Sequence, residues 1–472
     1  MGLERNRIPK KVDTVHLIAI CGTGMAALAC MLKDLGFRVT GSDQNVYPPM
    51  STFLADRGIE IYKGFHGDNL AHRPDLVVVG NAVSKDNPEV VSMNQLGLNF
   101  CSMPQAVNAF VAKDKKTILV TGTHGKTTTA SLVAWLLHAG GMDISFVIGG
   151  ILSNFGGNYR LGSGDYVVIE GDEYDTAYFD KGPKFMHYRP FVTVLTSIEF
   201  DHADIFSDMG HVAHVFENFI SGLAPESTLI ACHEDPTVVR LADQADCRVQ
   251  TYGKKTGGAW QMNHLSVQPP WSEFDVFRFG RFFSRFKAGL MGEHNLKNAL
   301  AAIAVADELS MTKASIQSAL QQFAGVKRRQ EVRGVKNGIT VLDDFAHHPT
   351  AVRETIRAVK PFVKGRLVAV FEPRTNTSMR DVFQDVYPHA FQGADLICIR
   401  EPSLLHKIPE GQRFSSAALV RDLQSQGMDG HYFENTDTII DFLKERTCPG
   451  DTILVMSNGG FDNIHERLLE SL

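Results

Sequence analysis

The chain has 472 residues and a formal net charge of −6, from 47 Lys and Arg against 53 Asp and Glu. At about 150 residues per domain this length predicts three domains. The mildly acidic balance argues against a nucleic-acid binder that relies on a general basic surface. Hydrophobic residues make up 44% and charged residues 21% of the chain, which is ordinary for a globular protein and excludes disorder as a description of the whole.

The cysteines and the hydropathy pattern indicate the compartment. The seven cysteines are scattered, and no Cys-x-x-Cys pair occurs, so a disulfide framework or a cysteine zinc site is disfavoured. No uncharged run reaches the roughly 18 residues that span a bilayer. The basic N-terminus carries no apolar segment with a cleavage site. We therefore expect a cytoplasmic protein with neither a membrane nor a nucleic-acid partner, and the oligomeric state is left open.

Short apolar runs alternate with helical patterns in three blocks along the chain. Continuous apolar strands of this kind are typical of parallel sheets covered on both faces, so we expect an α/β protein. The predicted domains span 1–113, 114–326 and 327–472, with a polar linker at 112–116. The predicted strands are 15–20, 37–40 and 76–80 in the first block, 117–121, 166–170, 192–196 and 228–231 in the second, and 339–342, 367–371, 396–399 and 452–456 in the third.

Other segments have a different periodicity. Apolar residues recur at helical spacing over 296–309, and a second helix is expected over 351–359. The stretch 250–288 has scattered aromatic residues and weaker patterning, which indicates a small antiparallel insert.

The strongest local signal is the segment GTHGKTTT at 122–129, which follows a predicted strand and precedes a helix. Backbone N–H groups that converge there, together with the helix N-terminus, favour a phosphate. Lys126 is placed to reach the β- and γ-phosphates of a nucleotide, and the hydroxyl of Thr127 to bind Mg²⁺. The general pattern asks for glycine where this chain has Val120.

Acidic residues follow two strands of the second block. Glu170 ends the strand 166–170, and the segment 197–202, with Glu199, Asp201 and His202, follows the strand 192–196. Because the carboxyl ends of parallel strands meet at one edge of a sheet, both groups are expected beside the phosphate loop. They are candidates for further magnesium ligands.

An earlier glycine-rich loop, Gly22-Thr23-Gly24-Met25, also follows a strand. It matches the pattern G-x-G-x-x-[GA], and Asp43 follows about 20 residues later, as in dinucleotide-binding proteins. Read alone, the pattern suggests a nicotinamide-dependent oxidoreductase. A sugar nucleotide presents the same diphosphate to a helix N-terminus, so the loop identifies a diphosphate ligand and leaves both classes open.

Together these features resemble the Mur ligases, the ATP-dependent amino-acid and peptide ligases of the peptidoglycan pathway. The resemblance rests on the phosphate loop, Glu170, the xxExDH pattern at 197–202, the GEHNLKN helix start at 292–298 and the third α/β block, and it covers essentially the whole chain. It implies a Rossmann-like N-terminal domain that binds UDP, a central P-loop ATPase domain and a Rossmann-like C-terminal domain, each with a mainly parallel sheet. It also implies a bacterial cytoplasmic enzyme of cell-wall synthesis and recycling.

Two branches of this family share the opening loop and the DDxxHHPT pattern at 343–350. One joins L-alanine to UDP-N-acetylmuramate, and the other joins the recovered murein tripeptide L-alanyl-γ-D-glutamyl-meso-diaminopimelate to the same sugar nucleotide, with ATP and Mg²⁺. The segments 45–52, 199–206, 371–377 and 456–461 resemble the second branch more closely. The alanine-adding branch stays an alternative, an NAD(P)-dependent oxidoreductase a remote one, and a non-catalytic nucleotide switch a third.

The resemblance implies roles residue by residue. Magnesium ligands fall on Thr127, Glu170 and His202. ATP contacts fall on Gly122, Thr123, His124, Gly125, Lys126, Thr127 and Thr128, on His294, Asn295 and Asn298 near adenine, on Asp344 at the ribose and on Arg329 at the γ-phosphate. UDP-sugar contacts fall on Gly22, Thr23, Gly24, Met25, Ser42, Asp43 and Asn81. Several relatives hold a second magnesium with a carbamylated lysine, but 203–224 contains no lysine here.

The chemistry of amide formation suggests the remaining roles. ATP activates a carboxylate as an acyl phosphate, and Lys126 and Arg329 are expected to stabilise the charge on the transferring phosphoryl group. The attacking amine needs a base or an anchor, and His347 and His348 are candidates because imidazole titrates near neutral pH. With His348, Arg374 and Asn376 are the expected acceptor contacts, because Arg374 follows a strand and suits a carboxylate.

Overall fold

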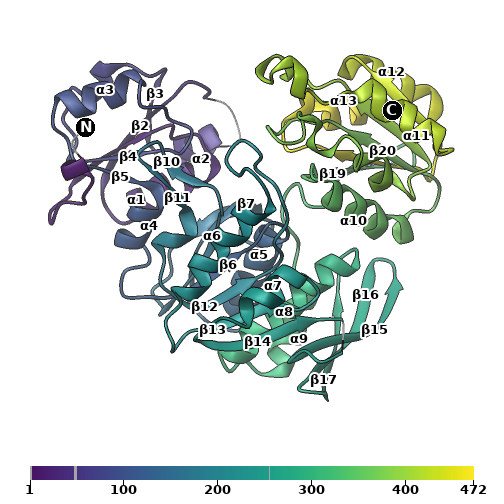
Figure 1. Ribbon diagram of the computed structural model, residues 1–472, viewed down its shortest axis with the longest axis horizontal. Coiled ribbons are helices and arrows are strands. Elements are labelled where there is room, and N and C mark those ends of the chain that lie inside the picture. The colour runs from purple at the N-terminus through teal and green to yellow at the C-terminus, as the bar shows by residue number, and fades with distance from the viewer. Residues whose placement is uncertain (1–2, 47–49, 255) are drawn as a thin grey trace.

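The computed structural model describes all residues except 1–2, 47–49 and 255, and it shows three α/β domains (Figure 1). Tyr47, Pro48 and Pro49 of the segment 45–52 therefore lie outside the described residues. The N-terminal domain (purple) and the C-terminal domain (green to yellow) lie above the central domain in that view. In the described part of the chain no helix has the length and apolar character needed to cross a membrane. All seven cysteines are free thiols.

The N-terminal domain is a five-stranded parallel sheet in the order β3-β2-β1-β4-β5. Its strands are β1 (Thr14–Ile18), β2 (Arg38–Asp43), β3 (Glu60–Lys63), β4 (Leu76–Val79) and β5 (Phe100–Ser102), and its helices are α1 (Thr23–Asp34), α2 (Met50–Asp56), α3 (Pro88–Gln95) and α4 (Met103–Phe110). The strand order reverses between β1 and β4. Open parallel sheets bind ligands at such a switch point, and α1 begins there.

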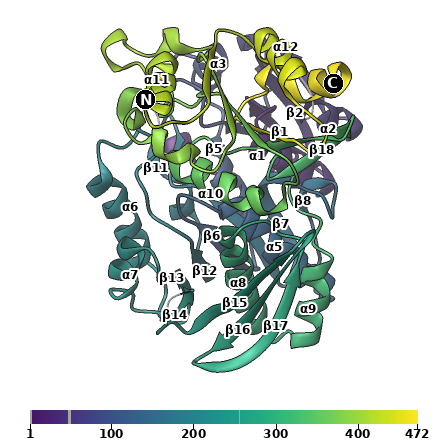
Figure 2. The ribbon, with the colours of Figure 1, turned by 90° about the vertical axis from the view of Figure 1, so that its right-hand side faces the viewer.

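The central domain has a ten-stranded sheet in the order β17-β16-β15-β14-β13-β12-β6-β9-β7-β8. Its strands are β6 (Lys116–Thr121), β7 (Ser145–Leu152), β8 (Gly157–Arg160), β9 (Tyr166–Gly171), β12 (Pro190–Leu195), β13 (Thr228–Cys232), β14 (Arg248–Gly253), β15 (Trp260–Gln268), β16 (Trp271–Arg278) and β17 (Arg281–Ala288). The six strands from β14 to β7 run parallel. The antiparallel strands expected within 250–288 are β15 to β17, and they continue the main sheet through β14 (Figure 2).

The helices of the central domain hold the phosphate loop in place. They are α5 (Lys126–Ala139), α6 (Met209–Ser221), α7 (Pro236–Ala242), α8 (Glu293–Glu308) and α9 (Lys313–Gln321), and a small hairpin is formed by β10 (Asp175–Ala177) and β11 (Asp180–Pro183). Side chains of α5 and α8 such as Leu136 and Leu300 are fully buried in one cluster with Trp260 of β15. The N-terminus of α5 is therefore anchored by a packed core.

The C-terminal domain is a six-stranded sheet in the order β18-β19-β23-β20-β21-β22, parallel except for the pairing of β18 with β19. Its elements are β18 (Glu331–Lys336), β19 (Ile339–Asp344), β20 (Leu367–Phe371), β21 (Leu396–Arg400), β22 (Gly430–Phe433), β23 (Thr452–Met456), α10 (Pro349–Val359), α11 (Ser416–Ser425), α12 (Thr436–Arg446) and α13 (Ile464–Ser471). The predicted fold class, three α/β domains with mainly parallel sheets, is confirmed. The domain boundaries 113/114 and 326/327 stay predictions; they fall between α4 and β6 and between α9 and β18.

Candidate active site

The loop between β6 and α5 requires two glycines for steric reasons. Gly122 and Gly125 have φ of +124° and +80°. A Cβ would lie 2.3 Å from Thr196 Oγ1 at the first position and 2.6 Å from Asn298 Oδ1 at the second, so a larger residue does not fit. Helix α5 begins at Lys126 with no side chain capping its N-terminus. These backbone donors at a helix N-terminus form a cradle for an anion.

Lys126 is ion-paired within this loop. Its ammonium lies 2.8 Å from Glu173 Oε2 and donates to the carbonyl oxygen of Gly122 at 2.6 Å. Burial works against the charge of Lys126, but the carboxylates of Glu173, Asp172 and Glu170 together outweigh it and raise the pKa of the ammonium. Glu173 also lies 3.5 Å from His202 Nε2. Sequence reasoning did not single out Glu173, although it lies in the acidic segment after β9.

Thr127 and Glu170 lie together at the carboxyl edge of the sheet. The Thr127 hydroxyl donates to Glu170 Oε1 at 2.7 Å, and the Gly149 amide donates to Oε2 at 2.6 Å. Burial, followed by the nearby Asp172, raises the pKa of Glu170, which marks a carboxylate with incomplete charge compensation. Hydroxyl and carboxylate oxygens are the ligands that Mg²⁺ prefers, so this pair fits a hydrated magnesium ion.

Arg329 reaches the phosphate loop from the junction of the central and C-terminal domains. Its Nη2 lies 3.4 Å from Thr127 Oγ1, and its guanidinium lies 4.7 Å above the centre of the Phe345 ring. The flanking residues Arg328 and Gln330 have φ of +60° and +51°, so the backbone adopts a left-handed conformation on both sides of Arg329. Burial lowers the pKa of Arg329, which Asp344 opposes.

Asp344 and the start of α8 lie around the same junction. Asp344 accepts the amide N–H groups of Gln330 and Ala346, each at 2.8 Å. Asn295 donates to Gln330 Oε1 at 3.0 Å and accepts from Asn298 at 3.3 Å. The phosphate loop, Arg329, Asp344 and these two asparagines are thus brought together.

His294 is enclosed at the same helix start. Among the described residues its Nδ1 has no hydrogen-bond partner, and burial lowers the pKa of its ring to about 4. An unpaired polar atom in a protein interior is unusual and is consistent with a ligand contact.

The N-terminus of α10 lies against the loop that follows β12. The Thr350 hydroxyl donates to Glu199 Oε2 at 2.7 Å. His348 Nδ1 accepts the Thr350 amide at 3.2 Å, which leaves Nε2 to donate to the carbonyl oxygen of Phe200, also at 3.2 Å. His348 is therefore the N-cap of α10, with both ring nitrogens engaged. Burial, followed by the nearby His124, lowers its pKa to about 4.

His347 has a different environment. Its Nδ1–H donates to the carbonyl oxygen of Phe345 at 3.0 Å, so the neutral ring carries its lone pair on Nε2. That Nε2 lies 3.8 Å from Asp201 Oδ2, at the edge of a pocket between the central and C-terminal domains. Of the two neighbouring histidines, only His347 therefore has a ring nitrogen at the edge of this pocket, where it faces the Asp201 carboxylate.

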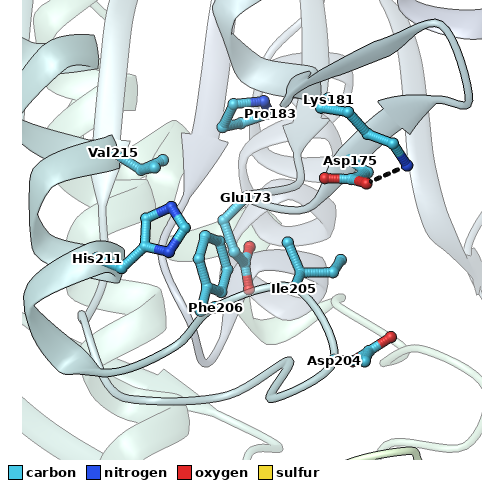
Figure 3. Close-up of a pocket in the computed structure, with 9 residues that line it drawn as sticks. All are labelled: Glu173, Asp175, Lys181, Pro183, Asp204, Ile205, Phe206, His211 and Val215. Atoms are coloured by element: carbon cyan, nitrogen blue, oxygen red, sulfur yellow. Dashed lines mark hydrogen bonds and ion pairs between the residues drawn. The ribbon is translucent and has the colours of Figure 1, made fainter.

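Two pockets adjoin this region and share Asp204. The first, here the junction pocket, has a volume of about 320 Å³ and is lined by Asp201, His202, Asp204, His347, Arg374, Thr375, Asn376, Thr377 and Asn458. The second, here the α6 pocket, has a volume of about 380 Å³ and is lined by Glu173, Asp175, Lys181, Pro183, Asp204, Ile205, Phe206, His211 and Val215. Figure 3 shows Glu173 of this pocket between α6 and the loop 204–206.

Two hydrogen bonds join the central and C-terminal domains beside the junction pocket. Asn376 of the C-terminal domain donates to Asp204 Oδ2 at 2.9 Å, and the Ala203 amide donates to Thr377 Oγ1 at 3.1 Å. The predicted acceptor residues Arg374 and Asn376 therefore lie beside His202 and His347.

The first glycine-rich loop has its own arrangement in the N-terminal domain. Helix α1 begins at Thr23, with Gly22 at the N-cap and no side chain capping the helix. Asp43 Oδ2 accepts the Cys21 amide at 2.9 Å, so this carboxylate supports the loop. Met25 is buried.

Of the other residues predicted for the sugar nucleotide, Asn81 is exposed and Ser42 is fully buried. The Ser42 hydroxyl donates to the buried carboxylate of Glu89 at 2.6 Å. The structure therefore presents Gly22, Thr23 and Asn81 to solvent but does not present Ser42.

Glycine-rich loops precede the uncapped N-termini of α1 and α5 in two separate α/β domains, and the domain of the second loop helps to line the junction pocket. This arrangement is typical of nucleotide-dependent enzymes. Three family models match the chain in order: the Mur ligase family catalytic domain over 14–115, the Mur ligase middle domain over 120–306, and the Mur ligase glutamate ligase domain over 328–459. The chain belongs to the Mur ligase family, as its motifs predicted. Members of this family are ATP-dependent ligases that form an amide bond.

Relatives match along the whole chain. The UDP-N-acetylmuramate–L-alanyl-γ-D-glutamyl-meso-2,6-diaminoheptandioate ligase of Escherichia coli strain K12 is 40% identical over 460 residues, which is 97% of this chain and 98% of that protein. The crystal structure of a murein peptide ligase from Psychrobacter arcticus has a TM-score of 0.73 and 33% identity over 97% of this chain and 98% of that one. That of the UDP-N-acetylmuramate–alanine ligase from Thermotoga maritima has a TM-score of 0.81 and 25% identity, with the same coverage.

Proposed function

We propose that the chain joins the tripeptide L-alanyl-γ-D-glutamyl-meso-diaminopimelate to the lactyl carboxylate of UDP-N-acetylmuramate, with ATP converted to ADP and phosphate. The observation that carries this proposal is the full-length identity of 40% to the E. coli ligase named for those substrates. Residues 374–377, the end of the segment 371–377 that resembles the peptide-adding branch, line the junction pocket, and this supports the choice of acceptor.

In this proposal the nucleotide lies between the phosphate loop, the start of α8 and Asp344. The ammonium of Lys126 leaves the Glu173 carboxylate and binds the β- and γ-phosphates, and the guanidinium of Arg329 binds the γ-phosphate. Thr127, Glu170 and His202 would hold Mg²⁺, which would supply positive charge beside the phosphates. His202 has φ of +53°, a strained conformation for a non-glycine residue, and such strain is often retained at functional sites.

The reaction proceeds in two steps. A lactyl carboxylate oxygen attacks the γ-phosphorus in line, the bond to the β-phosphate oxygen breaks, and ADP leaves. The amine nitrogen of the peptide then attacks the acyl carbon, the carbon–oxygen bond to phosphate breaks, and phosphate leaves. Lys126, once it has left Glu173, and Arg329 stabilise the charge that develops on the phosphoryl group in the first step.

The proton of the attacking amine goes to His347 Nε2. This nitrogen borders the junction pocket, and its acceptor state is set by the Nδ1–H bond to Phe345. His348 has no free nitrogen, so it acts by capping α10 and holding that helix against Phe200. Asp201, 3.8 Å from His347 Nε2, stabilises the imidazolium that forms.

The sugar nucleotide binds with its diphosphate at the N-terminus of α1. The backbone of Gly22, Thr23 and Gly24 is the expected contact, and Asn81 lies exposed after β4. Asp43 acts through the loop that it supports, and Ser42 through its bond to Glu89. The cytoplasmic location stays a prediction.

One experiment tests the function. The enzyme is incubated with ATP, Mg²⁺ and UDP-N-acetylmuramate together with L-alanine and the tripeptide, and the products are measured by mass spectrometry. We expect the UDP-linked tripeptide to form preferentially. A preference for L-alanine overturns the choice of acceptor in favour of the alanine-adding reaction. Binding of NAD(P)H in a thermal-shift titration, with no effect of ATP, overturns the ligase assignment.

A further inference from the structure

Arg374 is held from one side by the backbone of a neighbouring loop. It follows β20 and lines the junction pocket, and 31% of its side chain is exposed. The loop 458–460 after β23 passes so close that a Cβ on Gly459 would lie 2.1 Å from Arg374 Cδ and 2.2 Å from Nε. Arg374 can keep this conformation only while position 459 carries no side chain.

A buried carboxylate holds the guanidinium. Glu372 is fully buried, and its Oε1 lies 3.4 Å from Arg374 Nη1. The same oxygen accepts a hydrogen bond from Arg400 Nη1 at 2.5 Å, and Oε2 accepts the Ser457 hydroxyl at 2.7 Å. Glu372 therefore makes its short bonds to Arg400 and Ser457 and only a long contact to Arg374.

The charges in this group leave Arg374 available to a ligand. Arg400 is 8% exposed and also donates to Asp462 at 2.7 Å, so Glu372 and Arg400 compensate each other in the interior. Arg374 uses one of its five N–H donors in the contact with Glu372. Its other donors remain for an anion, and a guanidinium suits a carboxylate bound through two hydrogen bonds.

We propose that Glu372 and Gly459 are positioning residues that set acceptor specificity by fixing where Arg374 binds a carboxylate. The inference rests on the proposed function. In L-alanine the carboxylate and the attacking amine share one carbon atom. In the tripeptide that carboxyl group is consumed in an amide, and the first free carboxylate belongs to the D-glutamyl residue. A guanidinium fixed at one distance from the reacting centre therefore selects one of these spans and rejects the other.

The neighbouring glycines give a matched test. Gly459→Ala places a methyl group against the middle of the Arg374 side chain, which must move away. Gly460→Ala adds the same methyl group one residue later, where φ is −77° and no atom of the described residues lies within 4 Å of the new Cβ. We expect Gly459→Ala to raise the KM for the tripeptide about tenfold or more, the worth of one charged hydrogen bond. The KM values for ATP and UDP-N-acetylmuramate and the melting temperature should match those of Gly460→Ala.

Specificity is the second readout. The ratio of kcat/KM for the tripeptide to kcat/KM for L-alanine should fall in Gly459→Ala and in Glu372→Gln, and stay at the wild-type value in Gly460→Ala. If the two alanine variants behave alike, Gly459 has no positioning role. A rise in all three KM values together would show general damage to the domain and would also overturn the proposal.

A double-mutant cycle separates positioning from any direct role of the loop. If Gly459 acts through Arg374, then Gly459→Ala has no further effect on the tripeptide KM once Arg374→Ala is present. Additive effects overturn the inference even in an active enzyme. A wild-type protein that ligates neither acceptor overturns the proposed function instead, so the two failures are distinguishable.

Discussion

The ammonium of Lys126 lies 2.8 Å from the carboxylate of Glu173, and the two side chains are only 11% and 3% exposed. A lysine in a phosphate loop is expected to face phosphate oxygens, so Glu173 competes for the same positive charge. Burial works against the negative charge of Glu173, but Lys126 and His202 outweigh it and lower its pKa. Nucleotide binding must therefore replace a carboxylate with a phosphate on Lys126 and leave Glu173 to another cation.

Lys126→Ala should stop turnover and leave the sugar nucleotide bound. We expect a loss of at least about 10³-fold in kcat, because the charge on the transferring phosphoryl group loses a fixed cation. The Kd for UDP-N-acetylmuramate, measured by calorimetry, should stay at the wild-type value because that loop lies in another domain. Lys287→Ala, which removes a partly exposed lysine 3.6 Å from Glu273 on β16, is the control. Wild-type phosphate release in Lys126→Ala would refute the assignment.

The same variant should be less stable, for a separate reason. Removing one partner of a buried ion pair leaves an uncompensated charge, at a cost of about 3–5 kcal/mol. Adding Glu173→Gln to Lys126→Ala should restore most of the melting temperature without restoring turnover. If the single and double variants melt at the same temperature, the pair does not stabilise the domain.

The two adjacent histidines should respond differently to substitution. His347→Asn removes the proposed acceptor of the amine proton, and we expect kcat to fall about 10²–10⁴-fold. His348→Asn keeps a good N-cap for α10, and we expect kcat within several-fold of wild type. The rate of amide formation from preformed acyl phosphate, measured in a single turnover, would compare the second step between the two variants directly. The reverse order of effects would assign the proton transfer to His348.

Stability should fall as the pH is lowered, partly because of His348. Its pKa is about 4 in the folded protein and about 6.5 when unfolded. Between these values the unfolded chain binds the extra proton, so this contribution is lost as the pH falls from about 6.5 towards 4. At pH 5 the free energy of unfolding lost in this way amounts to about 2 kcal/mol. The free energy of unfolding in urea can be measured at pH 7 and at pH 5. Its difference between the two pH values should be smaller for His348→Asn than for wild type. An equal difference would contradict the lowered pKa of His348.

The amino-acid sequence predicted the buried central strands better than the strands at the edges of the sheets. The bounds of β20 and β23 match the expected 367–371 and 452–456, since central parallel strands are continuous apolar runs. No predicted strand corresponds to β3, a four-residue edge strand with no fully buried residue. β5 has three residues, too few for a periodic pattern.

Only part of the candidate site was predicted, because only some of its residues have a local sequence signature. A phosphate loop and strand-end acids have local signatures, so Lys126, Thr127 and Glu170 were identified from the pattern. Nothing local shows which carboxylate of an acidic segment turns inwards, and Glu173 was therefore missed. Ser42 is bonded to Glu89, 47 residues away, and that pairing depends on the packing of α3 against the sheet. Such contacts are properties of the tertiary fold.

Contacts across the junction pocket should keep water from the acyl phosphate. Thr377 is 2% exposed, and its hydroxyl accepts the Ala203 amide from the central domain. Thr377→Val keeps the shape and removes that bond, which leaves the partly buried Ala203 N–H without its partner at a cost of about 0.5–1.5 kcal/mol. The two domains should then separate more readily, and water should compete with the peptide amine.

This competition has a direct measure in the ratio of phosphate released to amide formed. We expect a ratio near one in wild type and above one in Thr377→Val, with the excess falling as the tripeptide concentration rises. Thr447→Val is the matched control, because its hydroxyl donates to the carbonyl oxygen of Leu443 at the end of α12, within the C-terminal domain. A ratio of one in both variants would mean that the acyl phosphate is protected without this contact, and the exclusion of water would have to be assigned to the substrates themselves.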